Sequence, residues 1–123
     1  MIVITDTVDL ISSLLTVTPR FKHSFPDTYE GDKFYVINSL GVPKDSIQTV
    51  EVNINCYAKD ANVQMGVPDL STLDTMVSSV ISDLNEYHYN GVFVELQMTN
   101  LFREEKINSH YINMRFQLTY LSN

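Results

Sequence analysis

The residues of this chain that could do chemistry are three histidines, one cysteine and a few neighbouring carboxylates. His23, His88 and His110 are far apart, and none has the His-x-x-x-His or Glu-x-x-His spacing that places metal ligands on one helix face. A metal site or a general base built from them would require distant segments to meet in the fold. We therefore predict no metal site, no cofactor and no catalytic residue.

The remaining reactive groups favour structural roles. Glu104 is adjacent to Glu105, and Glu30 is close to Asp32, in stretches that also contain lysine, which is typical of solvated turns. The four glycines are isolated and form no phosphate-binding loop, and no Gly-x-Ser-x-Gly sequence is present. Cys56 occupies one of the apolar positions of its alternating segment, so we expect a small buried side chain rather than a nucleophile. These residues predict that the chain is not an enzyme.

The charge and the start of the chain limit the partners. The 123 residues carry a formal net charge of −7, and the eight lysines and arginines are scattered. Tight binding to nucleic acid needs several cations on one face, so we expect no sequence-specific nucleic-acid binding. The apolar opening is too short for a signal peptide or a membrane span. We expect one domain over residues 1–123, without a membrane partner, that is made in a cytoplasm.

Two helices are predicted from apolar residues at helical spacing. The first covers residues 7–15, and Asp6 is positioned to cap it. The second begins near residue 70, where Asp69 or Ser71 is a suitable cap, and its apolar positions continue to Tyr87.

Four strands are predicted, over residues 34–40, 47–58, 92–99 and 111–121, mainly from alternating apolar and polar side chains. The resulting order is α-β-β-α-β-β. We predict an α+β fold with one four-stranded, mainly antiparallel sheet and two helices packed on one face. The opposite face is polar but mostly uncharged, which suits contact with a partner; an ordinary solvated face is the alternative.

Three irregular stretches, residues 18–33, 59–68 and 100–110, contain apolar side chains that either cover the core or bind a partner. The candidate contact residues are Phe21, Phe25, Tyr29, Val63, Met65, Val67, Leu101 and Phe102.

The element order, the length and two segments of this chain resemble the tail terminator and tail completion (head-tail joining) proteins of long-tailed bacteriophages. The first segment is the strand, link and helix of residues 50–84. The second is residues 100–104, with the sequence NLFRE, followed by a last strand that begins near His110. The resemblance implies a structural protein that forms a six-membered ring on the tip of the tail tube, ends tube polymerisation and presents the surface to which the head attaches.

The same resemblance implies partners and a location. The copies would bind one another as a homo-oligomer, and the ring would bind the tail-tube protein and a head-completion protein, with DNA passing through it. The protein would belong to the tail of the virion and would assemble in the cytoplasm of the bacterial host. No family motif marks the tube contact, so the resemblance assigns no contact residue.

Two other classes of function remain open. The charge of −7 also suits a small acidic binding module, such as an immunity or antitoxin-like inhibitor of a basic protein, although the carboxylates are dispersed along the chain. A small α+β enzyme that uses one of the histidines is the other alternative.

Overall fold

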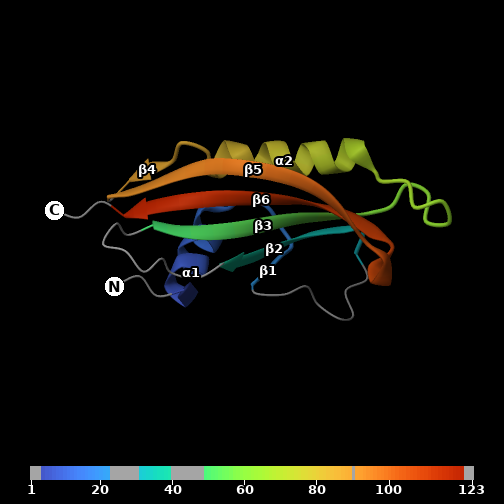
Figure 1. Ribbon diagram of the computed structural model, residues 1–123, viewed down its shortest axis with the longest axis horizontal. Helices are drawn as coiled ribbons and strands as arrows, with labels where there is room; N and C mark the ends of the chain where they lie inside the picture. Colours follow the sequence, from blue (N-terminus) through green and yellow to red (C-terminus); the bar gives the residue numbers. More distant parts are fainter. Residues whose placement is uncertain (1–3, 23–30, 40–48, 90, 121–123) are drawn as a thin grey trace.

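The computed structural model describes residues 4–22, 31–39, 49–89 and 91–120. In this part of the chain the helices are α1 (Ile4–Leu14) and α2 (Leu70–Leu84), and a short 3-10 turn, η1, covers Glu105–Ile107. The strands are β1 (Arg20–Lys22), β2 (Lys33–Ser39), β3 (Thr49–Lys59), β4 (His88–Tyr89), β5 (Val92–Glu104) and β6 (Ser109–Tyr120), as Figure 1 shows.

The strands form one six-stranded mixed sheet in the order β1-β2-β3-β6-β5-β4. β1 is parallel to β2, and the other neighbouring strands are antiparallel. The predicted four-stranded, mainly antiparallel sheet with the order α-β-β-α-β-β is therefore wrong, although the fold is α+β. The additional strands, β1 and β4, have three and two residues. Such short strands do not show the alternation from which strands are predicted.

The centre of the sheet is the pair β3 and β6, in which alternate side chains are apolar. Val52 lies opposite Phe116, and Ile54 lies opposite Met114. All four side chains are buried. Removing one such side chain from water contributes roughly 1.5–3 kcal/mol to stability, so this pair forms the middle of the core.

Both helices contribute to the core on this face of the sheet. Val8 and Ile11 of α1 and Leu73, Met76 and Val80 of α2 belong to one buried cluster with the alternate residues of β3 and β6. Spacings of three and four residues place these side chains on one stripe of each helix. In Figure 1, α2 runs along the length of the strands.

The first helix begins earlier than predicted. α1 starts at Ile4, so Asp6 lies within the helix rather than before its first turn. Just after α1, the backbone N–H of Thr16 donates to Oδ2 of Asp83 at 2.8 Å, and the Thr16 hydroxyl is 3.0 Å from the same oxygen. These bonds join the end of α1 to the last turn of α2.

The second helix has the predicted cap but is shorter than predicted. Asp69 accepts hydrogen bonds from the hydroxyl of Thr72 at 2.7 Å and from its backbone N–H at 3.1 Å. The two bonds stabilise the ionised carboxylate and lower the pKa of Asp69. The helix ends at Leu84, before Tyr87, and the intervening Glu86 has a φ of 62°, which is incompatible with a right-handed helix.

The β5–β6 hairpin is longer than the sequence predicts. The sequence predicts an irregular stretch from residue 100, but β5 continues to Glu104, and Asn108, with a φ of 50°, completes a tight turn before β6. A shift in register between Leu96 and Met98 changes which side chains face the helices. Because of this bulge, and because Leu101 is followed directly by another apolar residue, the segment lacks a regular alternation in the sequence.

Candidate interaction surface

The face of the sheet opposite the helices carries a second apolar cluster. In the described part of the chain, both helices pack on the other face. The cluster on this face comes from five segments and consists mainly of aromatic residues. Its members are the buried Phe34, Val36 and Tyr57 and the partly buried Phe21, Ile107 and Tyr111.

A row of aromatic rings crosses this face from β1 to β5. The centroids of Phe21 and Phe34 are 5.8 Å apart, and those of Phe34 and Tyr57 are 4.7 Å apart. Tyr57 stacks on Tyr111 at 4.6 Å, and Tyr111 is 5.4 Å from Phe102. Burial raises the pKa of Tyr57 to about 12, with a smaller contribution from Tyr111. We call these five residues the aromatic row.

Amide side chains occupy the next positions along the same face. Nδ2 of Asn113 donates to Oδ1 of Asn55 at 2.7 Å, and Nδ2 of Asn53 donates to Oδ1 of Asn38 at 3.1 Å. Oδ1 of Asn53 and Nε of Arg115 are buried without a hydrogen-bond partner. An unpaired buried polar atom destabilises the folded protein. At these two atoms, the described residues of this face leave hydrogen-bonding capacity unused.

The carboxylates on this face are not brought together. Glu51 and Glu95 both lie opposite Gln117, one from each side, because β6 separates β3 from β5. The carboxylate of Glu95 accepts from the side-chain amide of Gln97 at 2.8 Å. Glu51 and Glu95 therefore do not form a closely spaced acid–base pair.

Among the described residues, the outer edge of β5 has no paired strand over most of its length. β4 pairs with β5 at Val92 and Phe93, and no described strand pairs with the outer edge of residues 97–104. An open edge presents backbone N–H and C=O groups that another strand can bind, and such edges are commonly blocked by lysine or proline. Residues 97–102 contain neither. Three large apolar side chains of this edge are about half exposed: Met98 (46%), Leu101 (48%) and Phe102 (46%).

A turn over residues 62–67 adds further apolar surface at the same end of the sheet as the β5–β6 turn (Figure 1). A bridge between Asn62 and Val67 closes the turn. Met65 at its tip is 77% exposed. Gly66 has a φ of 65° and lies against the guanidinium of Arg103, where an added Cβ would come within 3.0 Å of the Arg103 Cζ. The turn therefore rests on β5.

The structure describes six of the eight predicted contact residues, and Phe25 and Tyr29 lie outside the described residues. Leu101 and Phe102 lie on opposite faces of β5, where they face Ile112 and Tyr111 of β6. Phe21 belongs to the aromatic row, at the opposite edge of the sheet. In the 62–67 turn, Met65 and Val67 are exposed and Val63 is half-buried. Five of the six therefore lie on β5 or on the turn that rests on it, and Phe21 lies by itself at the other edge.

A carboxylate with a buried side chain joins three segments. Asp60, just after β3, is fully buried; its Oδ1 lies 2.7 Å from Nδ1 of His110, and its Oδ2 lies 3.4 Å from Nε of Arg103. Asp60 also borders a hollow of about 410 Å³ together with Asp32 and Asp69. No group of three or more metal-ligating side chains occurs among the described residues. The arrangement satisfies the carboxylate and positions the turn that follows it.

Of the histidines that the structure describes, His88 does not join this cluster. His88 is exposed on β4, with its ring 6.3 Å from that of Phe93, and His23 lies outside the described residues. Sequence reasoning missed the contact between His110 and the carboxylate of Asp60.

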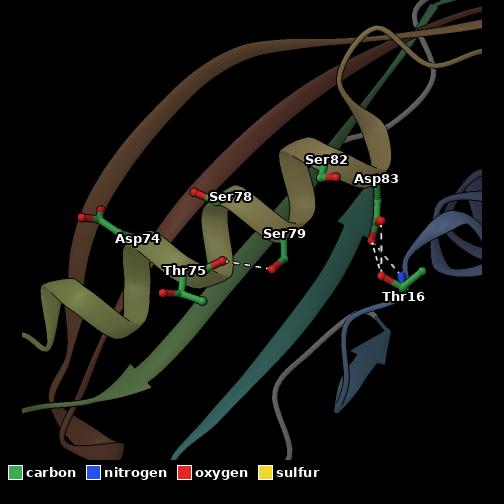
Figure 2. A pocket seen from close by; sticks show the side chains of 7 residues that line it. All are labelled: Thr16, Asp74, Thr75, Ser78, Ser79, Ser82 and Asp83. Atoms are coloured by element: carbon green, nitrogen blue, oxygen red, sulfur yellow. Dashed lines mark hydrogen bonds between the residues drawn. The ribbon is translucent and has the colours of Figure 1, made fainter.

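A second hollow, of about 480 Å³, lies between the end of α1 and the outer face of α2 (Figure 2). Two of the four α2 hydroxyl groups that line it bond within the helix: Ser79 donates to the carbonyl of Thr75 at 3.1 Å, and Thr75 donates to that of Ser71 at 3.1 Å. Figure 2 shows Asp83 turned toward Thr16, which it binds. Thr75 and Ser79 therefore make local helix contacts, and Asp83 makes a contact between the helices.

Sequence reasoning missed the aromatic row and the Asp60 cluster. Tyr57 and Tyr111 are aromatic residues at the polar positions of otherwise alternating segments, and that signal could have predicted a second packed face. No comparable signal marks Asp60, because its partner is 50 residues away.

Comparison with known proteins finds no family model and no curated protein that matches this chain. Neither described helix has the length and apolar character needed to cross a membrane.

Proposed function

We propose that this chain is a structural, non-catalytic protein of a bacteriophage or prophage. In this proposal, copies of the chain form a homo-oligomeric ring, with six members in the resembling family, at the end of the tail tube. The ring terminates tube polymerisation and provides the surface for head attachment. Its partners are the tail-tube protein and a head-completion protein, and its location is the virion tail.

The observation that carries the proposal is the exposed apolar surface at one end of the sheet. Met65 and Val67 on the turn and Leu101 and Phe102 on β5 are exposed, and the turn contacts β5 through Arg103. Grouped exposed apolar side chains typically mark a protein–protein contact. On an acidic chain of net charge −7, such a surface supports assembly into a larger particle better than it supports an isolated monomer.

The polar groups support a structural role in the same way. The Asp60 carboxylate contacts His110 and Arg103, and two of the four hydroxyl groups of α2 that line the other hollow are bonded to the helix itself. A catalytic site requires a titratable group placed within reach of a substrate. The described cluster is instead arranged to hold the link after β3.

The proposal is tested by electron microscopy and light scattering of the purified chain, and by adding it to a polymerising tail-tube protein encoded by a neighbouring gene. We expect rings, and tubes that become shorter as more protein is added. A strict monomer that leaves tube length unchanged contradicts the proposal. A neighbouring toxin gene, with tight binding of its basic product, would instead establish the acidic inhibitor.

A further inference from the structure

The second half of β5 lies outside the core. Val92 and Val94 at its start are buried, whereas every residue from 97 to 103 is exposed, so side chains on both faces of this stretch meet solvent. Residues 97–102 contain no charged side chain. On a chain with a net charge of −7, such a stretch can approach another copy of itself without repulsion between like charges.

The first half of β5 shows which backbone groups point away from β6. The N–H of Val94 donates to the carbonyl of Tyr87 at 2.9 Å, and the N–H of Leu96 donates to Oδ1 of Asn85 at 3.2 Å. Both acceptors lie beyond the outer edge of β5, so the outward groups of this half are bound. Along an antiparallel strand the backbone groups alternate in direction, which means that every second residue points outward.

The bulge shifts this alternation by one residue in the second half. β6 pairs with β3 without interruption, and on it Phe116, opposite Leu96, and Met114, opposite Thr99, are two residues apart. The two pairs are therefore of the same kind, and Thr99 points outward as Leu96 does. Leu101, two residues further on, points outward as well. Among the described residues, no group binds the outward N–H and C=O of these two residues.

The side chains of this stretch are complementary to those of a second copy. If two copies of the edge run antiparallel about a two-fold axis at Asn100, Thr99 lies opposite Leu101, and their outward backbone groups bind one another. Met98 then lies opposite Phe102, both 46% exposed and on the face opposite the helices, which gives a sulfur–aromatic contact on each side of the axis. The amide of Asn100 donates to Sδ of Met98 at 3.6 Å, a weak acceptor, whereas two such amides on the axis bind each other well.

We propose that residues 98–102 of β5 bind the same residues of a second copy, antiparallel and centred on Asn100, so that two sheets join across a two-fold axis. The occupant is a second copy because this register places apolar or polar side chains opposite one another and no charge opposite a charge. This is strand addition, in which backbone bonds supply affinity and side chains supply register. The contact is isologous and closes at two copies, so it goes beyond the proposed ring, whose neighbours meet through a heterologous contact.

A cysteine on the axis tests the register. Residues opposite each other in a pair without backbone bonds have Cα atoms about 4.5 Å apart, a separation that a disulfide spans. Asn100→Cys should therefore form a disulfide-linked dimer under mild oxidation, followed on a non-reducing gel. Ser78→Cys, with its thiol on the exposed side of α2, is the matched control and should link at least roughly tenfold more slowly. Cys56 is buried and present in both variants.

Two further variants block the edge in different ways. Leu101→Lys adds a charge that a two-fold contact contains twice. Thr99→Pro removes an outward N–H and should leave the bonds between β5 and β6 in place. Each should raise the apparent dissociation constant of the dimer about tenfold or more in sedimentation experiments. Ser78→Lys adds the same charge on α2 and should dimerise like the unmodified chain. Circular dichroism checks folding, and Leu101→Lys carries the test if Thr99→Pro does not fold.

Three results overturn the inference: an unmodified chain that stays monomeric at every concentration, an Asn100→Cys variant that links no faster than Ser78→Cys, and a Leu101→Lys variant that dimerises like the unmodified chain. Any of these together with rings that shorten tail tubes leaves the proposed function standing. Rapid linking of Asn100→Cys with unchanged tube length supports this contact while the proposed function fails.

Discussion

The carboxylate of Asp60 is held 2.7 Å from Nδ1 of His110, across the ends of the two central strands. The backbone of the same residue is also fixed, since its N–H donates to the carbonyl of Asn108 at 2.9 Å. Asp60 therefore fastens the link after β3 to the β5–β6 turn through both its side chain and its backbone. The link leads directly into the turn that carries Met65, so the position of that exposed side chain depends on this contact.

Replacing Asp60 tests this dependence. Asp60→Ala should lower the free energy of unfolding by about 1.5–3 kcal/mol, the usual range for hydrogen bonds to charged groups, because His110 and Arg103 both lose an acceptor. Urea denaturation measures the change, and limited proteolysis should show faster cleavage in the 62–67 turn. Asp32→Ala removes an exposed carboxylate from the same hollow and should change stability by less than about 0.5 kcal/mol. Equal effects of the two variants would contradict the role given to Asp60.

A substitution at the centre of the aromatic row should destabilise the protein more than a substitution at its β5 end. Phe34→Ala removes a buried ring that contacts both Phe21 and Tyr57, and should cost about 3–5 kcal/mol. Phe102→Ala removes a half-exposed ring and should cost about 1 kcal/mol. Thermal or chemical denaturation of the two purified variants gives the comparison. A Phe102→Ala variant as unstable as Phe34→Ala would show that the edge ring is part of the core.

The parts of the fold that the sequence predicts are those with a long and regular pattern. α2 has an apolar stripe and the cap Asp69, and β3 and β6 alternate over many residues, so that the burial of Cys56 is confirmed. Local patterns of this kind are set by the period of the element and need no knowledge of neighbouring segments.

The parts that the sequence does not predict depend on contacts between distant segments. β1 is a strand because it pairs with Tyr35, Val36 and Ile37 of β2, and its three residues carry no pattern of their own. The aromatic row requires the register that aligns Tyr57 with Tyr111, which the pairing of whole strands determines. Leu101 and the residue after it read as a break in alternation, whereas on a strand they simply face opposite sides of the sheet.

The thiol of Cys56 should be unreactive in the folded protein. The side chain is fully buried, its Sγ lies 3.9 Å from Sδ of Met114, and burial raises its pKa to about 12. Near pH 8 the thiolate fraction would be about one in ten thousand, and the thiolate is the reactive species. A colorimetric thiol reagent should detect no thiol in the native protein and one per chain after unfolding. A Ser78→Cys variant, whose added thiol is on the surface, should react at once; rapid reaction of the unmodified native protein would contradict the burial.

The free energy of unfolding should fall in alkaline solution at pH values below those at which three buried side chains of the folded protein ionise. Burial is the main cause that raises the pKa of Tyr35 and Tyr57 from 10.0, and that of Cys56 from 9.0, to about 12 in the folded state. Between those values the unfolded chain releases protons that the folded chain retains, so the free energy of unfolding decreases as the pH rises. The decrease is at most about 1.4 kcal/mol per pH unit for each group, and the stability that these groups provide is complete below about pH 9.

Denaturation midpoints measured from about pH 8 to about pH 11 test this slope. Tyr35→Phe removes one of the three groups while keeping the ring, so its stability should decline less steeply with pH than that of the unmodified chain. Absorbance of the phenolate form, followed in the same samples, should show the buried tyrosines ionising together with unfolding. If Tyr35→Phe has the same slope as the unmodified chain, the phenol of Tyr35 ionises equally in both states, and its burial does not control the alkaline stability.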